Sequence, residues 1–255
     1  PLSLVLDECG IYYDPRHPST LESHIHKAAK GLRVDQIQRA ERLKEKIIAS
    51  GLSKYNLSGD LPPIPDGCRI LVPGQVEDDA SILTGSPEIT RNADLLRKTR
   101  EANPDAVIVW KPHPDVVAGL RKGAVKDALR WADITLESCD ISELLQTVDE
   151  VWTLTSLTGF EALMRGCRVT TLGAPFYAGW GLTRDLGAVP ERRLIGPRPD
   201  LTALIHAVLI DYPRYFDPQT GLPCPVEVVV ERLAAGGPAH RGFGNRMLAK
   251  VQGMF

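Results

Sequence analysis

The 255-residue sequence has no charge excess of either sign, because 30 Lys and Arg residues face 32 Asp and Glu residues and leave a net charge of −2 with His neutral. Binding to nucleic acid through phosphate contacts needs a basic excess that displaces counterions, so nucleic acid is not expected as a partner. No apolar run approaches the roughly 18 residues of a transmembrane helix, and the first residues lack a signal-peptide pattern. The remaining composition, 43% hydrophobic and 24% charged, is typical of a globular protein.

Cysteine is scarce and poorly placed for pairing. The five cysteines are odd in number and widely spaced, and they form no CxxC motif: they are Cys9, Cys68, Cys139, Cys167 and Cys224. A disulfide framework or a zinc ribbon is therefore not expected, no metal site is predicted, and a reducing cytoplasm is indicated. The chain begins at Pro1 instead of Met, so we expect that an N-terminal part of a longer protein is missing.

The N-terminal region predicts a hairpin followed by a helix. Short apolar runs at 4–6 and 11–13 flank a polar turn, which is typical of two paired strands. Ser19 is the predicted N-cap of the helix, and Glu22 lies three residues later, as a capping box requires.

A second helix is predicted over 34–47 from apolar residues at helical spacing, with Gly51 as its stop signal. Residues 53–67 hold three prolines and two glycines and read as a linker. Residues 1–67 are therefore predicted as an N-terminal unit of hairpin, helices and linker.

From residue 69 the pattern alternates between short apolar runs and helical spacing. The predicted strands cover 69–72, 106–110, 134–136, 151–155 and 169–172. The predicted helices cover 92–101, 141–148, 159–164, 201–209 and 226–233. Such alternation predicts βαβ units, and right-handed crossovers place helices on both faces of a parallel sheet. The predicted fold is α/β: a Rossmann-like lobe at 68–235, followed by a flexible, Gly-rich and basic tail at 236–255.

In an open parallel sheet, ligands bind beyond the carboxyl ends of the strands. After the first strand, Gly74 permits a tight turn and Gln75 can hydrogen-bond a ligand. Asp78 and Asp79 follow, either as part of a substrate loop or as solvated surface acids. Neither GxGxxG nor GxxxxGK[ST] occurs, so neither NAD nor a P-loop is supported.

The second strand ends in Lys111-Pro112-His113-Pro114. Lysine and histidine side chains both donate to phosphate oxygens. The prolines fix φ, which reduces the entropy lost on binding. A structural role for His113 is the alternative.

The fourth strand runs into a helix through Thr155, Ser156, Leu157 and Thr158. A helix N-terminus offers free N–H groups and a partial positive charge, which suits an anion. Glu161, one turn further, can accept a hydrogen bond from a sugar hydroxyl. The alternative makes Ser156 or Thr158 an N-cap and Glu161 its capping-box partner, and both interpretations can hold.

The loop after the fifth strand, 173–185, places aromatic residues among glycines. Tyr177 and Trp180 can stack on a base or a sugar ring, or they belong to a packed lid. Together the four loops predict a site for a nucleotide sugar.

Four sequence runs in and around these loops resemble a known protein family. GQVEDDAS at 74–81, KPHPD at 111–115, TSLTGFEALMRG at 155–166 and PFYAGWGLTRD at 175–185 resemble the capsular polysaccharide synthesis family. Within it, the resemblance is to bacterial β-Kdo transferases of the KpsC/LipA type. The opening 1–22 and LIDYPRYFDPQTG at 209–221 are similar to that family too, so the resemblance covers residues 1 to about 233.

The resemblance implies the donor-binding lobe of a GT-B glycosyltransferase. It implies CMP-Kdo as the donor substrate, with no other cofactor, and a Kdo linker on phosphatidylglycerol as the lipid acceptor. His113 and Pro114 resemble the motif that holds CMP, Thr155 and Ser156 resemble the part that grips its phosphate, and Glu161 matches the position expected to hold the ribose. A cytoplasmic location follows, with peripheral attachment at the inner membrane and contact with the capsule export machinery as open options.

The sequence departs from the family in one respect, because no acidic motif resembling E-D-G-F occurs. The family carries that motif in an N-terminal lobe ahead of the region that begins this chain. No catalytic residue is therefore assigned, the missing lobe is an expected partner, and this part alone is expected to be inactive. The alternatives are an enzyme resembling UDP-sugar 2-epimerases of the GT-B type, or a non-catalytic module that binds nucleotide sugars. Which of the two transferase modules found in some family members this chain represents is left open.

Overall fold

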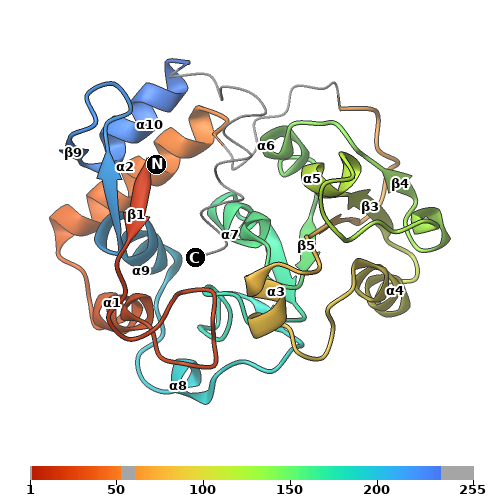
Figure 1. Ribbon diagram of the computed structural model, residues 1–255, viewed down its shortest axis with the longest axis horizontal. Helices are drawn as coiled ribbons and strands as arrows, with labels where there is room; N and C mark the ends of the chain where they lie inside the picture. The colour runs from red at the N-terminus through yellow and green to blue at the C-terminus, as the bar shows by residue number, and fades with distance from the viewer. Residues whose placement is uncertain (1, 53–60, 237–255) are drawn as a thin grey trace.

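The computed structural model describes residues 2–52 and 61–236 (Figure 1). Its main feature is a six-stranded parallel sheet in the order β4-β3-β2-β5-β6-β7. The strands are β2 (Arg69–Pro73), β3 (Val107–Lys111), β4 (Ile134–Thr135), β5 (Glu150–Thr153), β6 (Arg168–Thr171) and β7 (Arg184–Asp185). The predicted α/β parallel sheet is confirmed, and β7 is a strand that the sequence pattern did not predict.

Helices cover both faces of this sheet because successive side chains of a strand point to opposite faces. On one face, Ile70 and Val72 pack with α3 (Ala80–Gly85) and α4 (Asn92–Ala102). On the other face, Leu71 and Val109 belong to a core that includes residues of α6 (Ile141–Leu144) and α7 (Leu157–Met164). Strands buried on both faces read as continuous apolar runs, which is why the sequence revealed them.

The N-terminal and C-terminal segments of the described residues form a helical half beside the sheet, in red, orange and blue at the left of Figure 1. Its helices are α1 (Thr20–Ala29), α2 (Val34–Ala49), α9 (Leu201–Ile205), which continues as the π-helical segment η2 (His206–Asp211), and α10 (Val226–Ala234). Leu21 and Ile25 of α1 share one apolar core with Leu204 of α9 and Phe160 of α7. N-terminal and C-terminal helices therefore pack on each other and on the sheet, while the predicted domain boundaries at 67 and 235 stay a prediction.

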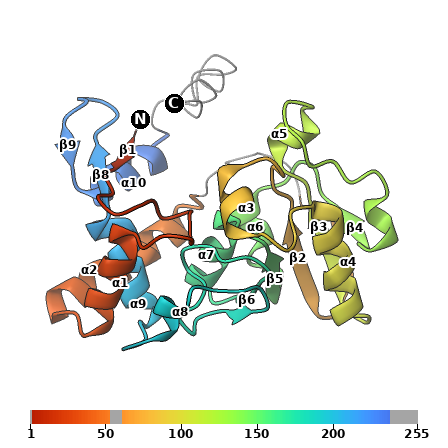
Figure 2. The ribbon, with the colours of Figure 1, turned by 60° about the horizontal axis from the view of Figure 1, so that its bottom comes forward.

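The predicted hairpin near the N-terminus is wrong. β1 (Ser3–Val5) pairs antiparallel with β8 (Pro213–Phe216), which also pairs with β9 (Pro223–Cys224), and residues 11–13 form no strand. Figure 2 shows β1 beside β8 and β9, away from the parallel sheet. The reason lies at Asp7, whose carboxylate accepts hydrogen bonds from the backbone N–H groups of Cys9, Gly10 and Thr20 and so folds the following chain into a loop.

Helix ends follow the predicted signals in most places. Ser19 caps α1 by accepting a hydrogen bond from Glu22 N at 3.2 Å, but the Glu22 carboxylate contacts arginines of a distant segment. The second helix is followed by Gly51 with a φ of +60°, as predicted. The predicted helix at 141–148 is shorter than expected, because α6 ends at Leu144.

The remaining helices are short: α5 (Pro114–Val117), the 3-10 helix η1 (Ala128–Arg130) and α8 (Glu191–Leu194). Of the predicted linker, residues 61–67 lie outside helices and strands, and 53–60 are outside the described residues. The tail predicted at 236–255 lies, apart from residue 236, outside the described residues as well. Among the residues the structure describes, no helix is both long and apolar enough to cross a bilayer.

Candidate functional site

The loops that follow β2, β3, β5 and β6 line a cavity of about 760 Å³ at the carboxyl edge of the parallel sheet. The chain runs from β2 outward to β3 and β4 and then returns to the other side of β2 with β5. The cavity thus lies where the strand order reverses, which is the usual binding place in open α/β sheets.

The cavity brings together most of the residues predicted from sequence. Those that line it are Gln75, Asp78, Asp79, Lys111, His113, Pro114, Thr155, Ser156, Leu157, Thr158 and Glu161. Tyr177 and Trp180 do not line it, because both rings are almost completely buried in the core. The Tyr177 hydroxyl donates to the Ser156 carbonyl, and Trp180 Nε1 donates to the carbonyl of Phe176. Of the two interpretations of this loop, the packed lid holds for these two rings, and Phe176 is the aromatic residue of the loop that lines the cavity.

Gln75 is a buried residue whose amide fixes the neighbouring strand end. Its Oε1 accepts hydrogen bonds from Thr153 Oγ1, Leu154 N and Thr155 N at 3.0, 3.2 and 3.1 Å. Its Nε2 donates to Thr155 Oγ1 at 3.0 Å. The side chain therefore joins the end of β2 to the turn that leads from β5 into α7, so its observed contacts position that turn.

The N-terminus of α7 opens into the cavity. Ser156 is its N-cap, and Ser156 Oγ accepts a hydrogen bond from Thr158 N at 3.2 Å, so the capping interpretation of Ser156 is confirmed. Glu161 is not a capping-box partner, because position N3 of this helix is Gly159. Leu157 is the first helical residue, and its N–H has no intrahelical acceptor, as at any helix start.

His113 lies at the N-cap of α5 and its Nδ1 accepts a hydrogen bond from Asp115 N at 3.2 Å. In a neutral imidazole whose Nδ1 is the acceptor, the proton sits on Nε2, which makes Nε2 a donor. Pro114 occupies the first helical position, where its missing N–H costs nothing. Gly74 lets the end of β2 approach this segment, since a Cβ there would meet Pro112 Cα at 2.9 Å.

Lys111, the last residue of β3, lines the cavity but is only 8% exposed. Its Nζ has no hydrogen-bond partner among the described residues. Burial lowers the pKa of this ammonium, and the nearby Cys139 and Asp140 offset that effect only in part.

Sequence reasoning missed the contribution of the N-terminal loop, residues 6–19, which we call the arm. Tyr12 and Tyr13 of the arm line the cavity, where the Tyr12 ring meets the Phe176 ring edge-on at 5.9 Å. Thr84 Oγ1 donates to the Tyr13 carbonyl at 3.0 Å and so links the arm to α3. The only local signal was the turn-forming Asp7 with Gly10, which is consistent with a hairpin as much as with a loop.

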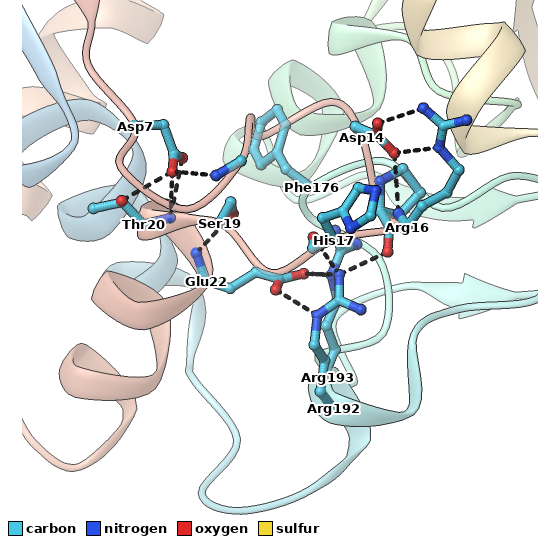
Figure 3. A network of polar contacts seen from close by, with 12 residues as sticks. Asp7, Asp14, Arg16, His17, Ser19, Thr20, Glu22, Phe176, Arg192 and Arg193 are labelled. Carbon is cyan, nitrogen blue, oxygen red and sulfur yellow. Dashed lines mark hydrogen bonds and ion pairs between the residues drawn. The ribbon is translucent and has the colours of Figure 1, made fainter.

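Two carboxylates hold the arm in place (Figure 3). Burial opposes ionisation of Asp7, but the N–H groups of Thr20, Gly10 and Cys9 together with the Tyr212 hydroxyl outweigh it and lower the pKa of Asp7 to about 2. Glu22 forms ion pairs with Arg192 and Arg193, so the arm is anchored at both of its ends.

The second anchor is the group formed by Glu22, Arg192 and Arg193 (Figure 3). Glu22 lies 2.7 Å from Arg192 Nε and 2.6 Å from Arg193 Nε. Arg192 also donates to the carbonyls of Pro15 and His17 in the arm. Burial raises the pKa of Glu22, but both arginines outweigh it and hold that pKa below its usual value. The arm is therefore tied to α8 as well as to α1.

Fold and cavity together define a Rossmann-like lobe with a ligand site at its switch point. Residues 66–215, more than half of the chain, match the model of the family described as capsule polysaccharide biosynthesis protein. The chain belongs to this family.

Two bacterial proteins are similar to this chain in sequence. The chain is 45% identical over 266 residues to the capsule polysaccharide modification protein LipA of Neisseria meningitidis serogroup B, a match that covers 100% of this chain and 37% of LipA. It is 44% identical over 240 residues to the lipopolysaccharide-processing protein LpsZ of Rhizobium meliloti, covering 92% of this chain and 54% of LpsZ. The chain thus spans little more than a third of LipA and about half of LpsZ.

Two solved structures of Thermosulfurimonas dismutans KpsC are similar to most of this chain. One, a beta Kdo 2,7 transferase, is 38% identical with a TM-score of 0.78. The other, a beta Kdo 2,4 transferase, is 34% identical with a TM-score of 0.81. Each match covers 92% of this chain and 73% of the KpsC chain. The fold is that of the Kdo transferases, which are GT-B glycosyltransferases, as the sequence resemblance implied.

Proposed function

We propose that this chain is the donor-binding part of a β-Kdo transferase, and that its cavity binds CMP-Kdo for synthesis of the lipid linker of a capsular polysaccharide. The observation that carries the proposal is the opening of the α7 N-terminus into the cavity beside His113. Helix N–H groups and the partial positive charge of the helix start suit a phosphate.

In this proposal each neighbouring residue has a definite part. The α7 N–H groups and the hydroxyls of Thr155 and Thr158 bind the CMP phosphate, and His113 donates from Nε2 to the nucleotide. Glu161, 6% exposed at the cavity wall, accepts from the ribose. Gln75 positions the turn, and Asp78 and Asp79 are exposed residues of the cavity lining, of which Asp78 pairs with Arg121 at 3.0 Å.

The acceptor in this proposal is a Kdo-bearing phosphatidylglycerol at the cytoplasmic face of the inner membrane, from where the product passes to the capsule export machinery. An N-terminal lobe of the same protein supplies the catalytic groups. A single lobe can offer phosphate contacts but cannot close over the acceptor and exclude water. We therefore expect the isolated chain to bind nucleotide without transferring sugar.

Calorimetric titration of the purified chain with CMP, UMP and UDP tests the proposal. CMP should bind measurably and more tightly than UMP or UDP. A preference for UDP would contradict it and favour an epimerase-like enzyme. Robust transferase activity from this chain alone would contradict the division of labour between the lobes.

A His113→Asn variant tests the site itself. Asparagine is a good N-cap, so its side-chain oxygen can still accept from Asp115 N and preserve the start of α5. The Nε2 donor is lost, which should weaken CMP binding by about 1.5–3 kcal/mol, roughly tenfold to a hundredfold. An unchanged CMP affinity, with an unchanged melting temperature, would remove His113 from the site.

A further inference from the structure

One residue of the cavity lining, Lys111, has a buried side-chain ammonium without a hydrogen-bond partner in the part of the chain that the structure describes. Four buried side-chain nitrogens have no hydrogen-bond partner among the described residues: Lys111 Nζ, Trp152 Nε1, Arg165 Nε and His206 Nδ1. Of these four residues, only Lys111 lines the cavity. A buried charge without a partner lowers stability, so buried charges in proteins are usually paired or hydrogen-bonded.

The position of Lys111 places it on the same side of the sheet as α7. Val109 and Lys111 share a face of β3 because they are two residues apart, and Val109 packs in the core that includes Phe160 of α7. β5, which leads into α7, is two strands away from β3. At about 4.8 Å per strand the two strand ends are about 10 Å apart. The cavity therefore offers two separate places for negative charge, one at Lys111 and one at the N-terminus of α7. The flexible four-carbon stem of lysine can carry the ammonium toward the helix.

The neighbouring ionisable side chains around the cavity already have partners within the protein. Arg121 pairs with Asp78, and the Asp79 carboxylate accepts from Ser81 N and Ser81 Oγ. His113 accepts at Nδ1 from a backbone N–H. A ligand with a single phosphate would bind at the α7 N-terminus and leave Lys111 without an anionic partner. A ligand with two anionic groups can bind at both places.

We propose that Lys111 binds the carboxylate of an acidic sugar in the donor, while the α7 N-terminus binds the phosphate. This inference rests on the proposed function and makes Lys111 the residue that distinguishes sugar-acid donors from neutral ones. In a CMP-activated 2-ulosonic acid such as Kdo, carboxylate and phosphate are attached to the same carbon. The two anions are therefore close together, which fits the placement of Lys111 and α7 on the same side of the sheet.

The test compares CMP with freshly prepared CMP-Kdo in binding titrations of the wild-type chain and Lys111→Met. Methionine keeps most of the length of the side chain and removes the charge. Lys122→Met, at an exposed lysine that does not line the cavity, is the matched control. We expect Lys111→Met to bind CMP within about twofold of wild type and to bind CMP-Kdo at least tenfold more weakly, as for a lost hydrogen bond between charged groups.

Two outcomes overturn the inference. Equal losses for CMP and CMP-Kdo would assign Lys111 to the phosphate, and no loss for either would make it a structural residue. Lys111→Gln provides a second uncharged variant if Lys111→Met fails to fold. Failure of the proposed function is distinguishable, because wild type would then bind neither ligand, whereas failure of this inference leaves both wild-type affinities in place.

Discussion

Replacing Gln75 with leucine should separate the architecture of the cavity from its chemistry. Leucine is similar in size to glutamine, so the change removes hydrogen bonds without opening a large cavity. It leaves Leu154 N, Thr155 N and Thr153 Oγ1 without the acceptor that the structure gives them. These three donors lie at the turn that aims the N-terminus of α7 into the cavity.

The magnitude follows from the exposure of each donor. A buried donor left without an acceptor costs about 1–3 kcal/mol. Leu154 is completely buried, so its N–H should bear the full penalty. Thr155 is only half-buried and water can replace part of its bond, while the Thr153 hydroxyl can rotate toward another acceptor. We therefore expect a loss of about 2–4 kcal/mol in unfolding free energy, or about 5–15 °C in melting temperature for a chain of this size.

Thermal and urea unfolding followed by circular dichroism measure this loss. Gln146→Leu, at an exposed glutamine outside the cavity, is the control and should stay within about 0.5 kcal/mol of wild type. Gln75→Glu keeps the acceptor oxygens and should retain more stability than Gln75→Leu, but its negative charge should weaken CMP binding. A melting temperature of Gln75→Leu within about 2 °C of wild type would refute the assigned role of the amide.

Three further changes test other parts of the structure. Arg193→Met should destabilise the fold by about 3 kcal/mol in urea unfolding, because Glu22 is 5% exposed and loses one of its two cationic partners; an unchanged midpoint would contradict the pairing. Gly159→Ala should lower the melting temperature although alanine favours helices, since a Cβ there would meet Tyr177 Cζ at 2.7 Å; a rise would show that the ring yields. The pKa of Asp7 is lowered to about 2 from 3.8, so its stabilisation is present above about pH 4 and is lost as the pH falls toward 2. The stability gap between wild type and Asp7→Asn should therefore shrink from pH 5 to pH 2 in acid-unfolding curves, and a constant gap would contradict this.

The parallel sheet could be predicted because its central strands carry their signal locally. Arg69–Pro73 and Val107–Lys111 are buried on both faces, so they appear as continuous apolar runs between polar turns. Because ligands bind beyond the carboxyl ends of parallel strands, the positions of these strands were enough to predict that Lys111, His113 and Ser156 lie around one cavity.

What could not be predicted depends on contacts between distant segments. β1 pairs with β8 more than 200 residues later, and no local pattern specifies such a partner. Ile11–Tyr13 has strand-like composition, but Asp7 holds the chain in a loop and delivers Tyr12 to the cavity. An aromatic residue in a glycine-rich loop is compatible with stacking on a ligand and with burial, so sequence alone could not separate Tyr177 from Phe176.

The contrast among the cavity residues bears on where a ligand would place its charge. Gln75, Ser156 and Asp79 use their side chains within the protein, on backbone N–H groups that build the cavity walls. Such a cavity is formed before the ligand arrives, which lowers the entropy cost of binding. Lys111 differs from these three residues, because its ammonium has no hydrogen-bond partner among the residues that the structure describes, and burial lowers its pKa. The buried ammonium of Lys111 lowers the stability of the protein without ligand and forms no hydrogen bond to a neighbouring element among the described residues. Its role is therefore best explained by an interaction with a ligand in the cavity.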